Sequence, residues 1–194
     1  MATVVDAPAA PLTYEAYMAE PQVEGRYDII NGVRIFMPGA SWDHQTISGN
    51  IGDLFRQFAR RSGAAKTVST PFDVLIRRVP KVQTRQPDVL LISLARLAQG
   101  GGILRRGPLP VAPELVVEIV SDSETQQMLG DKIKDYCAIG VDECWVVRPD
   151  ARTVEVLRLT PVGSQSVAVC DDTQTAASRV FPALAVPVAE VFAP

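Results

Sequence analysis

The sequence predicts an α/β fold with a mixed central β-sheet flanked by helices. Three observations support this prediction. A long amphipathic helix is expected over residues 41–62, strand-like segments lie on both sides of a second helix expected over residues 123–139, and residues 115–120 form a short apolar run rich in β-branched residues. Such a run is typical of a strand covered on both faces at the centre of a sheet. The order of the strands stays open at this point.

Length and composition predict one domain. The chain has 194 residues, of which 47% are hydrophobic, and it has no apolar run of the roughly eighteen residues needed to span a membrane. We expect a flexible segment at residues 1–11, where Ala and Pro are frequent, and a single domain over residues 12–194. The first residues lack the basic and apolar regions of a secretory signal, so we expect a cytoplasmic protein without a membrane partner.

Charge and cysteine content argue against two kinds of site. A formal net charge of −3 does not suit a protein that coats nucleic acid through a broad basic face, so a polyanion would have to bind locally. The local basic clusters are Arg56, Arg60 and Arg61, then Arg77, Arg78, Lys81 and Arg85, then Arg105 and Arg106. Cys137, Cys144 and Cys170 have no metal-binding spacing, and we interpret them as core thiols.

The first third of the chain contains clear start and stop signals. A short helix is expected from Leu12 to Met18. Asn31-Gly32 is the strongest two-residue turn signal, and its apolar flanks predict a β-hairpin over residues 26–39. Ser41 and Gly63 are expected to cap the long helix at its two ends. Apolar residues at helical spacing predict that this helix supplies a large share of the core.

The rest of the chain alternates between extended and helical patterns. Ser123 and Gln126 have the spacing of a capping box, which predicts the start of the second helix, and Gly140 is expected to end it. A Gly- and Arg-bearing loop is expected over residues 99–113, a length that is often functional or disordered. The remaining expectations are strands at 66–69, 72–78, 86–92, 115–120, 143–148 and 152–159, a short helix at 94–98, and a strand pair from about Ser166.

Glu118 is the residue that a purely structural strand would not need. It lies within the apolar run at residues 115–120, and burying a carboxylate there costs several kcal/mol unless a cation, a metal or strong donors compensate it. At about 100° per residue, Lys132 falls on the apolar face of the following helix, whereas Asp131, Lys134 and Asp135 fall on the opposite, solvated side. We therefore predict that Lys132 points toward Glu118.

Asp88 begins another apolar strand, directly after Pro87. Asp88, Glu118 and Lys132 would bring two carboxylates and one ammonium group to one sheet. Hard cations such as Mg²⁺ take oxygen ligands from one or two carboxylates, and a lysine close to the metal can orient water or stabilise developing charge. This arrangement predicts metal-assisted phosphodiester hydrolysis. The alternatives are a purely structural Glu118–Lys132 ion pair and an Asp88 that anchors a turn.

The sequence also resembles a known family over roughly residues 13–159. The matching segments are RYDIINGVRIFMP, SWDHQ, TPFDV, QPDVLLIS, PELVVEIVSDS, KIKDYCAIGVDECWVVRPD and RTVEVLRL. This ordered set resembles the Uma-two family of endonucleases, a branch of the PD-(D/E)XK nuclease superfamily. The resemblance implies a restriction endonuclease-like fold, Mg²⁺ as cofactor with Mn²⁺ as a substitute, and nucleic acid, expected to be DNA, as partner. Many relatives form dimers, so a homodimer is one expectation.

The resemblance also implies roles for individual residues. Asp88 and Glu118 match the metal ligands. The lysine of the superfamily motif would stand two residues after Glu118, where this chain has Val120, but the family as a whole uses a lysine four residues before a tyrosine, which Lys132 matches. Asp28 matches a glutamate of the first hairpin and is expected as an auxiliary catalytic acid. His44 is expected either to line the site or to be structural. Two family acids are replaced by Val33 and Met128.

These features support three functional hypotheses. The first is a Mg²⁺-dependent DNA endonuclease that uses Asp88, Glu118, Lys132 and Asp28. The second is a non-catalytic member of the fold that acts as a binding or scaffold module, as the departures at Val33 and Met128 suggest. A small-molecule metallohydrolase comes third, because the chain lacks a histidine-rich ligand set. Asp73 is expected to hydrogen-bond neighbouring backbone, and Tyr136 and Trp145 are expected in the core.

Overall fold

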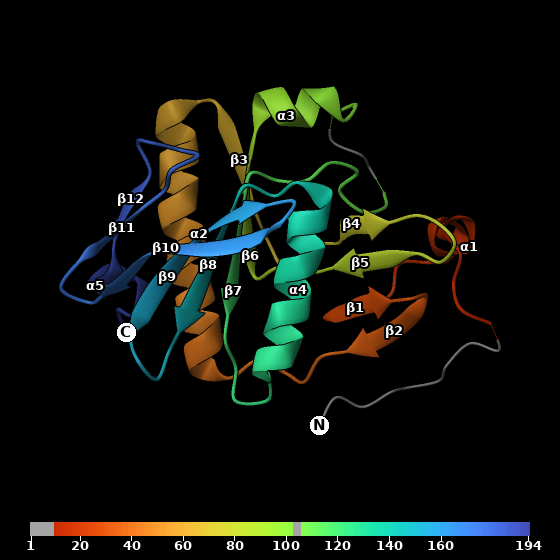
Figure 1. Cartoon of the computed structure of the whole chain (residues 1–194), viewed down its shortest axis with the longest axis horizontal. Coiled ribbons are helices and arrows are strands. Elements are labelled where there is room, and N and C mark those ends of the chain that lie inside the picture. The colour runs from red at the N-terminus through yellow and green to blue at the C-terminus, as the bar shows by residue number, and fades with distance from the viewer. Residues whose placement is uncertain (1–9, 103–105) are drawn as a thin grey trace.

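The computed structural model describes residues 10–102 and 106–194. Residues 1–9, which form most of the segment expected to be flexible, and residues 103–105, within the expected loop, lie outside the described residues. The elements are arranged around a six-stranded main sheet with helices on its two faces (Figure 1). The predicted α/β fold with a mixed central sheet is therefore confirmed.

The main sheet is mixed because one of its strand pairs is parallel. In spatial order its strands are β10 (Gly163–Asp171), β9 (Thr153–Thr160), β8 (Glu143–Arg148), β7 (Leu115–Ile119), β6 (Val89–Ser93) and β3 (Ala65–Ser69). β7 and β8 are parallel and are joined by helix α4 (Gln126–Ile139), as a parallel crossover requires. The other neighbouring pairs are antiparallel. β7 is thus a central strand with partners on both edges.

Two helices cover the two faces of this sheet. Helix α2 (Trp42–Ser62) packs Ile47, Ile51 and Phe55 against one face, whereas α4 packs Leu129 and Tyr136 against the other (Figure 1). Alternate residues of β7 divide between these two cores, since successive side chains of a strand point to opposite faces. The side chain of Glu118 accordingly lies on the α4 side.

A smaller four-stranded sheet lies beside α4. Its strands, in spatial order, are β2 (Val33–Phe36), β1 (Tyr27–Ile30), β5 (Gln83–Arg85) and β4 (Val74–Arg77). Helix α1 (Tyr14–Ala19) lies next to this sheet (Figure 1), and Leu12, Tyr27, Ile29 and Val82 form a separate small core. The predicted hairpin is present, with Asn31 and Gly32 at positive φ.

The remaining elements are two short helices and two short strands. They are α3 (Leu94–Gln99), β11 (Thr175–Ala177), β12 (Ala185–Pro187) and α5 (Val188–Val191). The tail differs from the expected single pair, because β10 begins at Gly163 and pairs with β9, whereas β11 and β12 form their own two-stranded sheet.

The caps of α2 agree with the prediction, whereas the N-cap of α4 does not. Ser41 accepts a hydrogen bond from the His44 N–H, and Gly63 ends α2 in the left-handed conformation, as predicted. The predicted capping box of α4 is wrong. A turn in which the Glu124 N–H donates to the Ser121 carbonyl separates Ser123 from the helix, and Thr125 is the actual N-cap.

Strand β5 was not predicted, because its sequence Gln-Thr-Arg has no apolar alternation. All three of its side chains are nevertheless buried. Buried polar residues need partners, so this strand marks the region where the polar networks described below are built. The three cysteines are free and buried, as predicted. Within the described residues, no helix combines the length and the apolar character that crossing a membrane would require.

Candidate active site

Asp88 and Glu118 meet because β6 and β7 are antiparallel neighbours. Val89 is paired with Val117, so the residue before β6 lies beside the last residues of β7. The Asp88 N–H donates to the Val117 carbonyl at 3.0 Å, and the Ile119 N–H donates to Asp88 Oδ2 at 2.7 Å. Both acids have 0% exposure. The start of one strand and the end of the next therefore place two buried carboxylates side by side.

Helix α4 supplies the groups that face Glu118. The Lys132 Nζ lies 2.7 Å from Glu118 Oε2, and the Tyr136 hydroxyl donates to Glu118 Oε1 at 2.5 Å. Lys132 and Tyr136 are four residues apart and so share one face of the helix. The inward direction of Lys132 was predicted from this spacing. Tyr136 is in the core, as expected, but its hydroxyl also belongs to the site.

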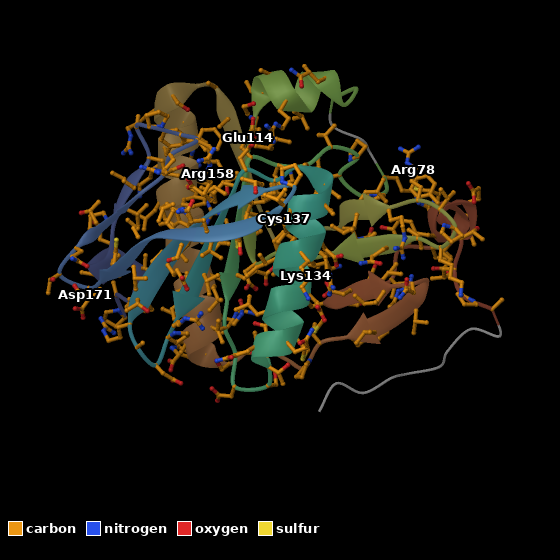
Figure 2. The ribbon with its side chains drawn as sticks, viewed as in Figure 1. Arg78, Glu114, Lys134, Cys137, Arg158 and Asp171 are labelled. Atoms are coloured by element: carbon orange, nitrogen blue, oxygen red, sulfur yellow. The ribbon has the colours of Figure 1, made fainter. Side chains whose placement is uncertain are left out.

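The outer side of α4 provides a contrast to Lys132. Lys134 has a side chain that is 73% exposed and pairs with Asp131 (Figure 2). Asp135 is not simply solvated, as the helical spacing suggested, because its carboxylate accepts hydrogen bonds from Arg85 and Gln83 of β5. The polar strand beside α4 explains this difference.

Glu124 is a second carboxylate on Lys132 that the sequence patterns did not identify. It lies in the segment between β7 and α4, its side chain is 7% exposed, and its Oε1 lies 2.8 Å from the Lys132 Nζ. Helical spacing could not reveal this contact, because Glu124 precedes the helix. The only sequence signal was an additional acid in the short connection between the Glu118 strand and the Lys132 helix.

Asp88 faces two basic side chains on its other oxygen. The Arg26 NH2 lies 2.7 Å from Asp88 Oδ1, and the His44 Nε2 lies 3.3 Å from the same atom. Neither is aligned to donate a proper hydrogen bond, so Asp88 Oδ1 is buried without a hydrogen-bond partner among the described residues. His44, in the first turn of α2, therefore lines the site. Arg26 was not predicted, since one arginine before a hairpin carries no pattern.

Asp28 lies close to the site, but both of its carboxylate oxygens already have partners. Its Oδ2 is 2.8 Å from Arg85 NH1, and its Oδ1 accepts the Gln86 N–H at 3.0 Å. Arg85 continues to Asp135 at 2.7 Å. The carboxylate of Asp28 therefore holds β1, β5 and α4 together through Arg85, and its charge acts on the site by raising the pKa of Lys132 and of Tyr136.

The protonation of the site follows from burial and from these charges. Burial raises the pKa of Glu118 to about 7, with Lys132 opposing this rise and Asp88 and Glu124 adding to it. Burial also acts to raise the pKa of Asp88, but His44, Arg26 and the Ile119 N–H outweigh it and lower the pKa. Burial acts to lower the pKa of Lys132, but Glu118 and Glu124 prevail and raise it. At neutral pH Asp88 is an anion and Lys132 a cation.

Comparison with known proteins identifies the family. The family model of Uma2, described as "Putative restriction endonuclease", matches residues 14–189. The chain belongs to the Uma2 family. A solved structure described as a putative nuclease belonging to DUF820, from Anabaena variabilis, has a TM-score of 0.76 at 19% identity, with 94% of this chain and 98% of that chain covered. That likeness shows the restriction endonuclease-like fold. No curated protein matches the chain.

Membership of Uma2 clarifies the departures noted in the sequence. A valine replaces the lysine usual two residues after the glutamate, yet Lys132 of α4 makes the contact with Glu118. Met128 replaces an acid four residues before that lysine, yet Glu124 brings a carboxylate to the same ammonium group. Lys132 occupies the position at which the resemblance places the lysine of the family, and Glu124 brings its carboxylate from the connection before α4.

The acidic pair fits a hard divalent cation. Among the described residues, no group of three or more His, Cys, Asp or Glu side chains is placed to hold a metal. Mg²⁺ does not require such a group, since it commonly takes one or two carboxylates and completes its shell with water and substrate oxygens. Within residues 10–102 and 106–194, nothing donates an aligned hydrogen bond to the buried Asp88 Oδ1, and each Glu118 oxygen accepts from one side-chain donor and so retains a lone pair.

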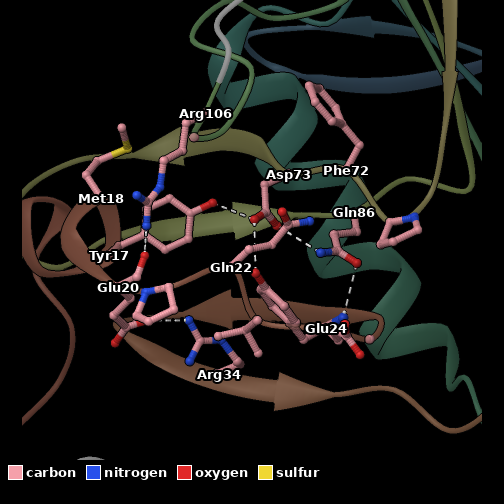
Figure 3. Close-up of a pocket in the computed structure, with 16 residues that line it drawn as sticks. Tyr17, Met18, Glu20, Gln22, Glu24, Arg34, Phe72, Asp73, Gln86 and Arg106 are labelled. Atoms are coloured by element: carbon pink, nitrogen blue, oxygen red, sulfur yellow. Dashed lines mark hydrogen bonds and ion pairs between the residues drawn. The ribbon is translucent and has the colours of Figure 1, made fainter.

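A cavity of about 710 Å³ is lined by residues that include Tyr17, Asp73 and Gln86 (Figure 3), and neither Asp88 nor Glu118 is among its lining residues. Asp73, at its wall, accepts hydrogen bonds from the Tyr17 and Tyr27 hydroxyls, the Thr84 hydroxyl and the Gln86 amide. The expectation that Asp73 bonds neighbouring backbone is wrong, because these donors are side chains distant in sequence. Gln86, which lines the cavity, precedes Asp88 by two residues in the chain.

Proposed function

We propose that this Uma2 protein is a Mg²⁺-dependent endonuclease that hydrolyses phosphodiester bonds of DNA. The observation that carries this proposal is the meeting of Asp88 and Glu118, two fully buried acids on neighbouring strands, with the buried ammonium group of Lys132 on one of them. Burying three charges in this way is costly, and such sites cluster where chemistry is performed. The family assignment supports the same reaction class.

Asp88 and Glu118 are the residues that would hold the metal. A bound Mg²⁺ would polarise the phosphoryl oxygen and lower the pKa of a bound water. For this role Glu118 has to be ionised, which its pKa of about 7 permits only in part at neutral pH. The charge of a cation would favour the ionised form further.

Lys132 would act on the water or on the developing charge. Its ammonium group has three N–H donors, and Glu118 and Glu124 occupy two of them. The third has no recorded acceptor in the described segments and would be available for the attacking water or for a phosphoryl oxygen. The two carboxylates fix the position of Nζ, so that the donor is oriented before the substrate arrives. Tyr136 fixes the other oxygen of Glu118 in the same way.

The substrate, assembly and location are proposed on the same family basis. DNA is the substrate class that the word "restriction" in the family description implies. A homodimer would place two such sites on the two strands of a duplex, whose symmetry it would match. We further propose one domain over residues 12–194 and a cytoplasmic location.

Plasmid nicking tests the proposal. Purified protein is incubated with supercoiled plasmid and Mg²⁺ or Mn²⁺, alongside Lys132→Ala and Lys134→Ala, and structured RNA is tested in parallel. We expect nicking by the wild type and by Lys134→Ala, which alters only an exposed lysine of the same helix. Nicking by Lys132→Ala that equals the wild type, or its absence from all three proteins, would contradict the proposal. Cleavage of RNA alone would correct the substrate.

A binding or scaffold module is the second candidate, because Val33 and Met128 replace family acids. Isothermal titration calorimetry with Mn²⁺ separates the two functions. A nuclease site predicts micromolar binding that Glu118→Gln abolishes. A scaffold predicts no binding in either protein.

A further inference from the structure

Arg26 lies at the centre of the acidic cluster. It precedes β1, its guanidinium is 2.7 Å from Asp88 Oδ1, and its NH1 lies 3.4 Å from His44 Nε2. Burial acts to lower its pKa, but the fields of four carboxylates outweigh burial and raise it. These carboxylates belong to Asp88, Glu118, Asp28 and Glu124. The guanidinium of Arg26 thus neutralises part of the charge that would attract a divalent cation.

The contact between Arg26 and Asp88 is close but poorly formed. Asp88 Oδ1 accepts no aligned hydrogen bond, and Arg26 Nε is buried without a partner among the described residues. Charge therefore holds the two groups together without the fork geometry that makes arginine–carboxylate pairs strong. A pair of this kind costs less to separate than an aligned one.

Arg85 of β5 also faces carboxylates, and it provides a comparison for the contact between Arg26 and Asp88. Its NH1 donates to Asp28 at 2.8 Å, and its Nε donates to Asp135 at 2.7 Å. Arg85 has a 9% exposed side chain, against 21% for Arg26. Arg85 is thus fixed by aligned bonds to two acids, whereas Arg26 is partly open to solvent and lacks such bonds to Asp88.

We propose that Arg26 is a displaceable counter-ion of Asp88, which a divalent cation replaces at Oδ1 and which then binds a phosphate of the nucleic acid. The inference rests on the proposed metal-binding role of Asp88 and Glu118. Arginine suits the second task, because its planar guanidinium binds phosphate through two parallel hydrogen bonds. The competition makes metal binding weaker in the free protein, and it couples metal entry to the release of a phosphate ligand.

Calorimetric titration with Mn²⁺ alone tests the competition without any cleavage. The proteins are the full-length wild type, Arg26→Gln, Arg26→Lys and Arg85→Gln, each checked by thermal unfolding. We expect Arg26→Gln to bind Mn²⁺ about tenfold more tightly than the wild type, because the competitor at Asp88 is gone. Arg85→Gln removes a guanidinium from the same acidic region, and we expect it to give less than half of this gain on a logarithmic scale.

Three results would overturn the inference. They are an Arg26→Gln affinity equal to or below that of the wild type, an equal gain in Arg85→Gln, and no Mn²⁺ binding by any variant. If Arg26→Gln does not fold, Arg26→Lys decides, since its single ammonium is a weaker competitor for a carboxylate. Tighter Mn²⁺ binding by Arg26→Lys supports the inference, and unchanged binding overturns it.

Oligonucleotide binding tests the second half of the inference. Fluorescence anisotropy with a labelled DNA oligonucleotide is measured in Ca²⁺ and in EDTA. We expect Arg26→Gln to weaken binding at least about fivefold in Ca²⁺ but not in EDTA, where Arg26 remains on Asp88. Equal weakening in both would overturn it. Nicking by the wild type without a gain of Mn²⁺ affinity in Arg26→Gln would overturn this inference alone, whereas a gain without nicking would overturn only the proposed activity.

Discussion

Asp73 and Asp88 are buried acids that precede and follow β5 in the chain, and their carboxylates are bonded in opposite ways. Asp73 accepts four hydrogen bonds from neutral side chains, those of Tyr17, Tyr27, Thr84 and Gln86. We call these five residues the Asp73 cluster. Asp88 instead faces charged Arg26, and its Oδ1 accepts no aligned hydrogen bond in the part of the chain that the structure describes. The first carboxylate is satisfied, whereas the second keeps an unused acceptor.

Asp73 and Asp88 differ in their hydrogen bonding rather than in their burial. Burial is similar, since Asp73 is 9% and Asp88 0% exposed. What differs is the completeness of the hydrogen bonding, because a fully satisfied network rigidifies a fold and an unsatisfied acceptor retains its capacity to bind a ligand. One chain segment serves both acids: Thr84 and Gln86 bond Asp73, whereas Asp88 lies two residues further along.

Replacing Asp73 or Asp88 with alanine should give the largest difference in activity between the two acids. We expect Asp88→Ala to reduce cleavage about a thousandfold, because a metal ligand contributes several kcal/mol to the reaction. Asp73→Ala should leave cleavage per folded molecule within about threefold, since Asp73 touches only structural donors. Plasmid nicking under conditions where both variants are folded measures this. Equal losses in the two variants would remove the distinction.

Removing Lys132 should have the next largest effect. Lys132→Ala leaves Glu118 and Glu124 buried without their common cation, and breaking a buried pair costs about 3–5 kcal/mol. Urea unfolding at pH 8 measures the loss. Lys134→Ala is the matched control, with an expected change of less than about 0.5 kcal/mol. A similarly small loss of stability in Lys132→Ala would mean that water already screens the charges of Glu118 and Glu124.

The pH dependence of stability should follow Glu118. Burial raises its pKa from 4.5 to about 7, so the folded state binds its proton more tightly than the unfolded state does. Stability from this group is fully present below pH 4.5 and is lost as the pH rises through about 7, by up to about 3 kcal/mol. Glu118→Gln should flatten this decline in urea unfolding between pH 5 and 8. If the stability of Glu118→Gln declines with pH at the same slope as the wild type, groups other than Glu118 cause the decline.

Two tyrosines give the smallest and most selective comparison. Tyr17→Phe and Tyr136→Phe each remove one hydroxyl that donates to a buried acid, so each should cost about 1.5–3 kcal/mol. Only Tyr136→Phe should alter Mn²⁺ affinity, because only its acid is a proposed ligand. Calorimetry together with unfolding separates the two effects. An altered Mn²⁺ affinity in Tyr17→Phe would show that the Asp73 cluster takes part in the site.

The sequence predicted those parts of the fold that depend on local signals. Ser41 and Gly63 bound α2 because a cap and a left-handed glycine act within a few residues. Lys132 could be placed because helical spacing fixes its direction once the sheet side is known. The position of Asp88 next to Glu118 depends on the antiparallel register of β6 and β7, which no local pattern encodes.

Long-range contacts explain what could not be predicted. β5 is polar and very short, and it exists because Gln83, Thr84 and Arg85 meet partners far along the chain. Arg26 and Glu124 join the site only because the hairpin and the loop before α4 fold toward β6 and β7. Contacts of this kind leave no periodic trace in the sequence, so they require the structure.

A crystal structure of the wild type grown with Mn²⁺ would test the central claim most directly. We predict an anomalous peak between the Asp88 and Glu118 carboxylates, with the Arg26 guanidinium moved away from Asp88 Oδ1. No peak between these two acids at saturating Mn²⁺, with Arg26 still in contact with Asp88, would contradict the account.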